Sequence, residues 1–260
     1  QTILTKTNYQ QKEIVSVKDS LSRVTYKPVT ANVSSPFYNA SAMDGYAIKS
    51  IDTASADLDN PITIQKGFYQ PSNTGDEIPL EYDAVIMIED IQMNEDDSIT
   101  IIKSIKSYEN IRPIGEDIIN GDIIIPRNHL IRPIDISVML SAGINDITVY
   151  KKPSVIIIPT GDEIIRDVTK LKKGKIIDSN SYYLLNELKQ DYCNPVLHDI
   201  VKDDYDTLNK ALVKAAKEYD LVLVGAGSSA GSKDYTKHII EENGTVFVHG
   251  ISIKPGKPTI

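Results

Sequence analysis

From residue 153 onward the chain alternates short apolar runs with segments of helical periodicity, and this alternation limits the possible folds more than any other feature. Strands that alternate with helices form βαβ units, in which helices cover both faces of a parallel sheet. The expected strands are 155–158, 175–178, 196–201, 221–224 and 245–249, and the expected helices are 179–190, 203–219 and 235–243. The sequence therefore predicts a parallel α/β domain over residues 151–260.

The first 150 residues follow a different pattern. Short β-rich runs separated by Gly, Pro and Asn occupy residues 61–131, as expected of a small β domain. A short helix is expected to begin within 15–21, and residues 26–33 are expected to be extended. The apolar spacing and closing glycine of 133–143 predict a further helix. A chain of 260 residues suits two or three domains, so we expect a multidomain protein of α/β plus β class.

Charge and cysteine content narrow the possible partners. The formal net charge is -8, which disfavours binding to nucleic acids and to anionic membranes. The longest apolar runs are strand-sized, so no membrane span is expected. The single cysteine, Cys193, rules out an internal disulfide and is most simply a semi-buried apolar residue. These features suit a protein of the reducing cytoplasm.

Polar or glycine-rich residues follow each expected strand. The carboxyl ends of the strands in an open parallel sheet lie along the edge where ligands bind. The segments in question are 159–163, 178–180, 202–204, 225–234 and 250–257. We expect them to gather at one edge of the sheet.

The residue types in these segments suit a phosphorylated ligand and a divalent metal. The glycines of 225–231 allow a close approach of the backbone, nearby serines offer hydroxyl groups, and the following helix directs its positive end at the turn. Lys254 and Lys257 can neutralise phosphate charge. The carboxylates are hard oxygen donors suited to magnesium; they are Asp162, Glu163, Asp203 and Asp234.

Each of these features by itself also has an ordinary structural explanation. A glycine-rich turn after a strand is often only a tight turn, loop carboxylates commonly cap helices, and Pro-Gly between lysines is commonly an exposed turn. Their convergence on one edge favours a ligand. The spacing over 225–231 is G-x-G-x-x-x-G, and the next expected strand ends at His249 rather than at an acidic residue. Both points disfavour a nicotinamide or flavin dinucleotide.

Five motifs in order along the chain resemble the MoeA family of molybdopterin molybdotransferases, which is related to the E domain of gephyrin. They are SAMDGYA (41–47), IRPIGED (111–117), TGDE (160–163), GSKDYT (231–236) and IKPGKP (253–258). The first and last are specific signatures, and together the five cover nearly the whole chain.

The resemblance implies an activity. Such enzymes insert molybdate, or tungstate in some organisms, into the dithiolene of adenylylated molybdopterin, with assistance from magnesium and release of AMP. It also implies an elongated homodimer of four-domain subunits, with molybdopterin adenylyltransferase as a possible pathway partner. The active cleft is expected between domain III of one subunit and domain II of the other.

The resemblance also implies a domain layout. Domain I would comprise 1–38 and 115–150 as an extended dimerisation domain, and domain II would be the β-rich insertion 39–114. Domain III, 151–260, would be a truncated molybdopterin-binding domain similar to MoaB and MogA. Domain IV is absent from the 260 residues, so we expect the chain to be a fragment or its parent to be shorter than usual.

Position by position, the resemblance assigns candidate site residues. Those expected to act in catalysis are Asp44, Asp117, Glu163, Asp203, Asp234, Lys254 and Lys257. Those expected to bind the pterin substrate are Thr74, Gly225, Gly227, Ser228, Ser229, Gly231 and Ser232. Those expected to bind the metal are Glu163 and Asp234.

One departure from the family pattern leaves ligand preference open. The usual family turn is G-G-x-S-x-G, whereas residues 225–231 read GAGSSAG. The alternative hypotheses are a non-catalytic pterin- or nucleotide-binding scaffold module and an unrelated nucleotide enzyme with affinity for NAD or ATP.

Overall fold

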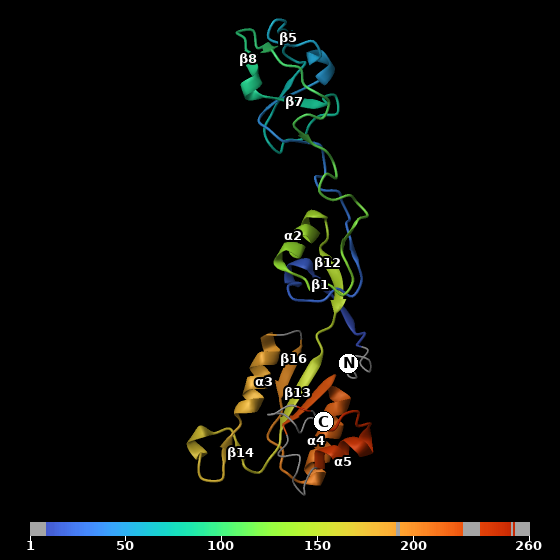
Figure 1. Ribbon diagram of the computed structural model, residues 1–260, viewed down its shortest axis with the longest axis vertical. Coiled ribbons are helices and arrows are strands. Elements are labelled where there is room, and N and C mark those ends of the chain that lie inside the picture. Colours follow the sequence, from blue (N-terminus) through green and yellow to red (C-terminus); the bar gives the residue numbers. More distant parts are fainter. Residues whose placement is uncertain (1–8, 191–192, 226–234, 251, 253–260) are drawn as a thin grey trace. The chain divides into compact units, whose positions relative to one another are not determined.

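The computed structural model describes residues 9–190, 193–225, 235–250 and 252 of the chain. The chain divides into two compact units. The N-terminal unit is Glu13–Val149, and the C-terminal unit combines Gln1–Lys12 with Tyr150–Ile260. Each unit is a body with its own buried apolar residues, and its elements can be followed along the colour gradient of Figure 1.

Short strands dominate the N-terminal unit. Its strands are β1 (Lys12–Ser16), β2 (Val29–Thr30), β3 (Ala40–Ser41), β4 (Gly45–Ile48), β5 (Ile62–Ile64), β6 (Gln70–Ser72), β7 (Ala84–Met87), β8 (Ile91–Met93), β9 (Ile99–Ile101), β10 (Ile111–Arg112), β11 (Ile123–Ile125) and β12 (Asp146–Tyr150). Its helices are α2 (Pro133–Ser141) and the 3-10 turns η1 (Val17–Asp19), η2 (Ser50–Thr53) and η3 (Ile88–Asp90). The β-rich character predicted for 61–131 is confirmed.

The helix expected to begin within 15–21 is reduced to η1. Residues of β1 pair with β12 instead, which leaves only one 3-10 turn, with the Ser16 hydroxyl accepting a hydrogen bond from the Lys18 amide. Strand pairing therefore overrides the local helical pattern. The helix predicted over 133–143 is confirmed as α2, with Pro133 at its start and Gly143 at φ +73° after its end. Proline in the first turn and glycine past the last turn are the usual signals for these two ends.

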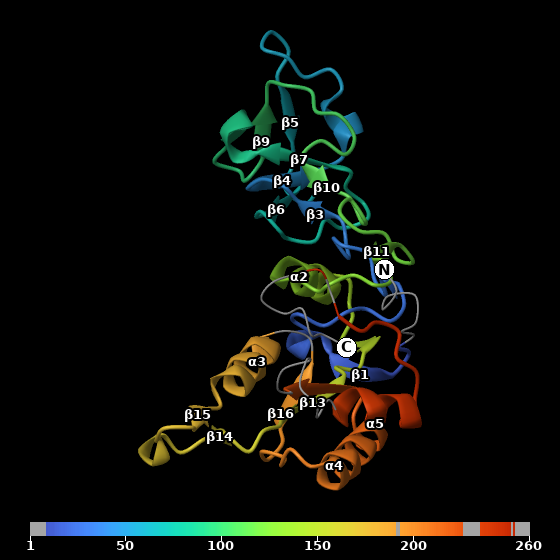
Figure 2. The ribbon, with the colours of Figure 1, turned by 60° about the horizontal axis from the view of Figure 1, so that its bottom comes forward.

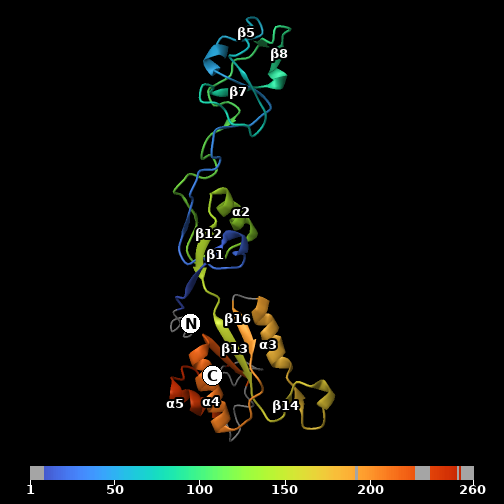
Figure 3. The same cartoon turned by 180° about the vertical axis from the view of Figure 1, so that it is seen from behind.

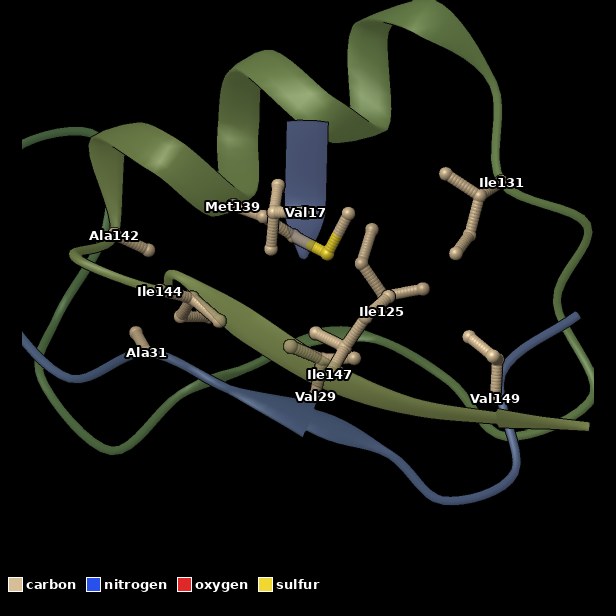
Figure 4. Close-up of a cluster of buried hydrophobic side chains, with 10 residues drawn as sticks. All are labelled: Val17, Val29, Ala31, Ile125, Ile131, Met139, Ala142, Ile144, Ile147 and Val149. Carbon is tan, nitrogen blue, oxygen red and sulfur yellow. The ribbon is translucent and has the colours of Figure 1, made fainter. Parts of the chain in front are cut away.

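Helix α2 packs on a cluster of buried apolar side chains drawn from the beginning and the end of the unit (Figure 4). The cluster consists of Val17, Val29, Ala31, Ile125, Ile131, Met139, Ala142, Ile144, Ile147 and Val149. Figure 4 shows Met139 of α2 directed toward Ile125 of β11. Segments more than 90 residues apart in sequence are thus joined by apolar burial, which is the main favourable term in folding.

Two antiparallel sheets of three strands carry the middle of the unit. Their strand orders are β6-β4-β7 and β5-β9-β8. Separate clusters of buried residues pack on them, with members between residues 47 and 111. The predicted division into 1–38 plus 115–150 and 39–114 stays a prediction.

Strand β4 requires glycine at its first residue. A Cβ added to Gly45 would lie 1.9 Å from the carbonyl oxygen of Ile86 on β7, far inside van der Waals contact. Only a residue without a side chain permits this approach. The glycine of the SAMDGYA motif therefore has a packing role, because it lets β4 lie against β7 directly after Asp44.

The C-terminal unit is built on a parallel three-stranded sheet of order β16-β13-β17. Its strands are β13 (Ser154–Pro159), β14 (Ile164–Ile165), β15 (Ile176–Ile177), β16 (Asn194–Leu197) and β17 (Leu221–Gly225). Its helices are α3 (Ser179–Gln190), α4 (Tyr205–Glu218), α5 (Tyr235–Asn243) and the 3-10 turn η4 (Val168–Lys170). Figures 1 and 3 show α3 on one side of the sheet and α4 with α5 on the other. The predicted α/β domain with a covered parallel sheet is confirmed.

The structure corrects three expectations for this unit, two of them only in part. Residues 245–249 are not assigned to a strand, and Phe247 is 59% exposed. Residues 175–178 contribute β15, which pairs in parallel with β14 and stands apart from the main sheet (Figure 2). The strand expected over 196–201 is β16, which ends at Leu197, and only an isolated bridge joins Val201 to Thr160. Within the described residues, no helix is long and apolar enough to cross a membrane.

Candidate functional site

The first group of candidate residues lies at the start of β4. One carboxylate oxygen of Asp44, Oδ1, accepts hydrogen bonds from the Thr74 amide at 2.8 Å and from the Thr74 hydroxyl at 3.0 Å. These two donors lower the pKa of Asp44, the amide contributing most. Asp44 is therefore an exposed carboxylate with one oxygen held by Thr74.

Thr74 is presented by a tight turn. The Asp76 amide donates to the Asn73 carbonyl at 2.9 Å, Gly75 has φ +93°, and the Gly75 amide donates to Ser41 at 2.8 Å. Positive φ at the third residue of such a turn favours glycine. The N-T-G-D sequence thus fixes the donors that hold Asp44.

Asp117 lies in a different arrangement. The Arg112 guanidinium donates from Nη2 to Asp117 at 2.6 Å and from Nε to Glu116 at 2.7 Å. All three side chains are about half exposed, so these two ion pairs contribute little to stability. The structure therefore joins Asp44 to Thr74, whereas Asp117 is held by Arg112.

The second group lies at the carboxyl edge of the parallel sheet. The Thr160 amide donates to the Gly225 carbonyl at 2.9 Å, and the Gly161 amide donates to the Val201 carbonyl at 3.2 Å. Backbone hydrogen bonds thereby join the residues after β13 to the last residue of β17 and to Val201, which follows β16. Of the five segments expected at this edge, these bonds join 159–163 to Gly225, the first residue of 225–234, and to Val201, which directly precedes 202–204.

Glu163 is placed by the backbone of Gly161. Gly161 has φ +140°, and a Cβ added there would lie 2.8 Å from Oε2 of Glu163. The carboxylate of Glu163 therefore folds over the α-carbon of Gly161, in space that only glycine leaves open. Glu163 is exposed, and its side chain has no hydrogen bond or ion pair to any residue that the structure describes.

The two adjacent carboxylates after β16 have different roles. Asp204 is the N-cap of α4, and its Oδ1 accepts a hydrogen bond from the Thr207 amide at 2.9 Å. That bond lowers the pKa of Asp204. Asp203 is half-buried, and within the described residues its carboxylate has no partner. Asp203 is thus the carboxylate of the pair that remains available to a ligand.

Sequence reasoning did not select Arg166, the only arginine in residues 151–260. Its guanidinium donates to the His198 carbonyl and to Oδ2 of Asp178 at 3.4 Å, and it lies 3.6 Å from Asp199. A lone arginine immediately after TGDE-Ile-Ile was the available signal, but its partners become adjacent only in the folded chain.

Comparison with known proteins identifies the family. The family model described as "MoeA N-terminal region (domain I and II)" matches residues 1–143, more than half of the chain. The chain belongs to the MoeA family. A second model, described as "Probable molybdopterin binding domain", matches residues 156–260.

Individual MoeA-type relatives cover the chain almost completely. A molybdopterin biosynthesis protein of Methanocaldococcus jannaschii is 38% identical over 94% of the chain and 65% of that protein. The molybdopterin molybdenumtransferase of Haemophilus influenzae is 32% identical over 95% of the chain and 64% of that protein. A crystal structure of the MoeA protein from Pyrococcus horikoshii matches with a TM-score of 0.88 and 27% identity, covering 99% of this chain and 68% of the other. The chain thus spans less than two thirds of the length of the two curated relatives.

Several MoeA motif residues lie outside the described residues. They are Gly227, Ser228, Ser229, Gly231, Ser232, Asp234, Lys254 and Lys257. Among residues 9–190, 193–225, 235–250 and 252, no three His, Cys, Asp or Glu side chains are grouped closely enough to hold a metal. The assignment of Glu163 and Asp234 as metal ligands therefore stays a prediction.

Proposed function

We propose that the protein inserts molybdate or tungstate into adenylylated molybdopterin with release of AMP, as a magnesium-dependent molybdopterin molybdotransferase. The observation that carries this proposal is the carboxyl edge of the sheet. There the backbone ties among Thr160, Gly161, Val201 and Gly225 place Glu163 and Asp203 on adjoining loops. Membership of the MoeA family supplies the substrate class.

The described residues suit a site that works by positioning and charge. Glu163 is exposed and free of partners among the described residues, so it can orient a substrate group or accept a proton at an oxygen atom. Gly225 ends β17 and opens the glycine-rich segment that would approach the phosphate. Reactions of this kind gain most of their rate from orientation and preorganised charge.

A magnesium ion is compatible with these donors. Magnesium commonly takes one or two protein carboxylates and completes its shell with phosphate oxygens and water. Glu163 and Asp234 are the proposed ligands, and Glu163 is an unpaired hard oxygen donor within the described chain. The ion, when bound, would neutralise phosphate charge.

The remaining elements of the proposal concern assembly and location. We propose a cytoplasmic homodimer in which Asp44, Thr74 and Asp117 of one subunit complete the site on the other. Lys254 and Lys257 would bind the phosphate arm. Molybdopterin adenylyltransferase would supply the adenylylated substrate. The Thr74 donors lower the pKa of Asp44 and hold one of its oxygens, which suits a residue that binds a cationic or hydrogen-bond-donating group.

The test uses the full-length protein with adenylylated molybdopterin, molybdate and magnesium, and AMP release is followed by chromatography. Glu163→Gln and Asp44→Asn keep the size of each side chain but remove its charge, so each is expected to slow AMP release by about a hundredfold. The matched control is Asp146→Asn, because Asp146 is an exposed carboxylate on β12 and its charge should not matter.

The outcomes separate an enzyme from a scaffold. Absence of AMP release from the unaltered protein would contradict the proposal. Unchanged turnover in both Glu163→Gln and Asp44→Asn would remove these residues from the site. Substrate binding that survives with no turnover in the unaltered protein would favour the non-catalytic scaffold.

A further inference from the structure

Residues 161–178 leave the parallel sheet and return to it, and Glu163 stands at the start of this excursion. The excursion contains β14 and β15, which pair in parallel, with Ile164 opposite Ile176. Figure 2 shows the pair apart from the β16-β13-β17 sheet. Because the pair does not belong to that sheet, the contacts at its two ends help to determine its position.

Arg166 supplies the side-chain contacts at the point where β14 ends. Its Nε donates to Oδ2 of Asp178, the residue that follows β15, at 3.4 Å. Its Nη2 donates to the carbonyl of His198, just beyond β16. One guanidinium thus joins the end of β14, the end of β15 and the exit of the sheet's edge strand.

The contact between Arg166 and Asp178 matters for stability because the Asp178 carboxylate is buried. The Asp178 side chain is 4% exposed, and its other oxygen accepts a hydrogen bond from the Ser181 amide at 3.2 Å in the first turn of α3. A buried carboxylate needs partners for both oxygens, and a cation is the strongest. Arg166 is 26% exposed, so it serves as this partner at the margin of the fold.

The geometry requires the forked donor set of arginine. Its planar group presents several N–H donors in fixed directions, so it bonds a carboxylate and a carbonyl at the same time. A lysine ammonium carries its donors on a single nitrogen, so we expect it to serve these two acceptors less well. The third neighbour, Asp199, is 99% exposed at 3.6 Å and contributes little.

We propose that Arg166 is a positioning residue that anchors the excursion and thereby fixes the carboxylate of Glu163 at the edge of the sheet. The link is short, because the Glu163 carbonyl accepts from the Ile176 amide at 2.9 Å and the Ile165 carbonyl accepts from the Asp178 amide at 2.9 Å. Loosening β14 from β15 therefore moves the backbone of Glu163. The consequence for turnover rests on the proposed function, whereas the anchoring itself does not.

The test compares Arg166→Met, Arg166→Lys and the control Asp199→Asn in the full-length protein. The first readout is hydrogen–deuterium exchange of peptides covering 164–178, with peptides of α4 as an internal reference. Arg166→Met is expected to speed exchange over 164–178 about tenfold, without change in α4, because a charge-assisted tie is lost. Arg166→Lys should give a smaller change, and Asp199→Asn none.

The second readout separates kcat from KM for AMP release. Arg166→Met is expected to lower kcat about tenfold to a hundredfold with KM within about twofold, because a misplaced catalytic group costs rate more than binding. The kcat of Arg166→Lys should lie between that of Arg166→Met and that of the unaltered protein. A general loss of folding would instead reduce the fraction of folded enzyme, and kcat would then not fall in the order unaltered protein, Arg166→Lys, Arg166→Met.

A double variant tests whether Arg166 merely neutralises a buried charge. In Arg166→Met with Asp178→Asn, no carboxylate is left unpaired, but the tie to His198 is still missing. Fast exchange and low kcat are expected to persist. Recovery of both in the double variant, or unchanged exchange over 164–178 in Arg166→Met, would overturn the inference. If the unaltered protein releases no AMP, the proposed function fails, and the exchange data still decide whether Arg166 anchors the excursion.

Discussion

Replacement of Asp135 is expected to destabilise the N-terminal unit in a pH-dependent way. The carboxylate accepts hydrogen bonds from the Arg132 amide at 2.8 Å, from Arg132 Nη2 at 2.9 Å and from Arg132 Nε at 3.1 Å. It also lies 2.7 Å from Nε2 of His129. Asp135 is 5% exposed, so these contacts are shielded from water on the carboxylate side.

The expected loss of stability depends on how much each of these contacts contributes to the free energy of unfolding. Arg132 is 62% exposed, so its ion pair with Asp135 is partly screened and contributes less than a buried pair. Loss of the N-terminal cap of α2 alone costs about 0.5–2 kcal/mol, and breaking a fully buried pair costs about 3–5 kcal/mol. For Asp135→Ala we expect a loss of about 2–4 kcal/mol in the free energy of unfolding at pH 7.

The pH dependence has a definite sign. The Arg132 side chain is the main cause of a pKa of Asp135 well below its usual range, with help from the Arg132 amide and His129, while burial acts in the opposite direction. A pKa depressed by folding gives stability that is present above the unfolded pKa and lost as pH falls toward the folded value. At pH 3, roughly one unit below the unfolded pKa, about 1 kcal/mol of the difference between the unaltered protein and Asp135→Ala should have disappeared.

The assay is urea unfolding followed by far-UV circular dichroism at pH 7 and pH 3. The chain has no tryptophan, so hydrogen exchange of α2 peptides identifies which transition is affected. Asp146→Ala, at an exposed position on β12, should change stability by less than about 0.5 kcal/mol. Equal stability of Asp135→Ala and the unaltered protein at pH 7, or a difference that grows on acidification, would refute the reasoning.

Two glycine substitutions test close approaches of the backbone. In Gly45→Ala the new Cβ would lie 1.9 Å from the Ile86 carbonyl oxygen, so we expect a loss above about 3 kcal/mol in thermal or urea unfolding. Gly67→Ala, with φ +94° and no neighbour within 4 Å, should cost only about 1 kcal/mol, and equal effects of the two would contradict this account. In Gly161→Ala the new Cβ meets Glu163, so we expect kcat for AMP release to fall about tenfold while the Tm drops by only a few degrees. Unchanged kcat there would show that the location of the Glu163 carboxylate does not matter.

The sequence predicted those elements whose signals are local. Helix α4 was predicted from the spacing of its apolar residues, and its inward face is Leu208, Leu212 and Ala215. Strand β13 was predicted because Val155 to Ile158 is a short run of apolar residues, which suits a strand buried on both faces. Residues 245–249 carry a similar pattern but are not assigned to a strand, so a short apolar run by itself does not establish one.

Long-range contacts account for the site features that the sequence could not provide. Asp44 and Thr74 were matched through the resemblance to the MoeA family, but only the folded turn at Asn73 to Asp76 shows that Thr74 holds Asp44. Arg166 was missed because Asp178 and His198 lie 12 and 32 residues away in sequence. The packing role of Gly45 was missed for the same reason, since Ile86 belongs to another strand.

Neighbouring carboxylates at the carboxyl edge of the sheet differ in their hydrogen bonding, and the difference follows from their positions relative to the helices. Asp204 begins α4, where unpaired amides demand an acceptor, so its charge is used by the Thr207 amide. Asp203, one residue earlier, precedes the helix and has no such demand on it within the described chain. Likewise Asp178 is committed to α3 and Arg166, whereas Glu163 rests over Gly161 with its oxygens unpaired by any described residue. At this edge, Asp178 and Asp204 accept hydrogen bonds from the first turns of α3 and α4. Glu163 and Asp203 lie on the loops that lead to these two residues. The hydrogen bonds at the helix starts therefore help to hold the loops that carry Glu163 and Asp203.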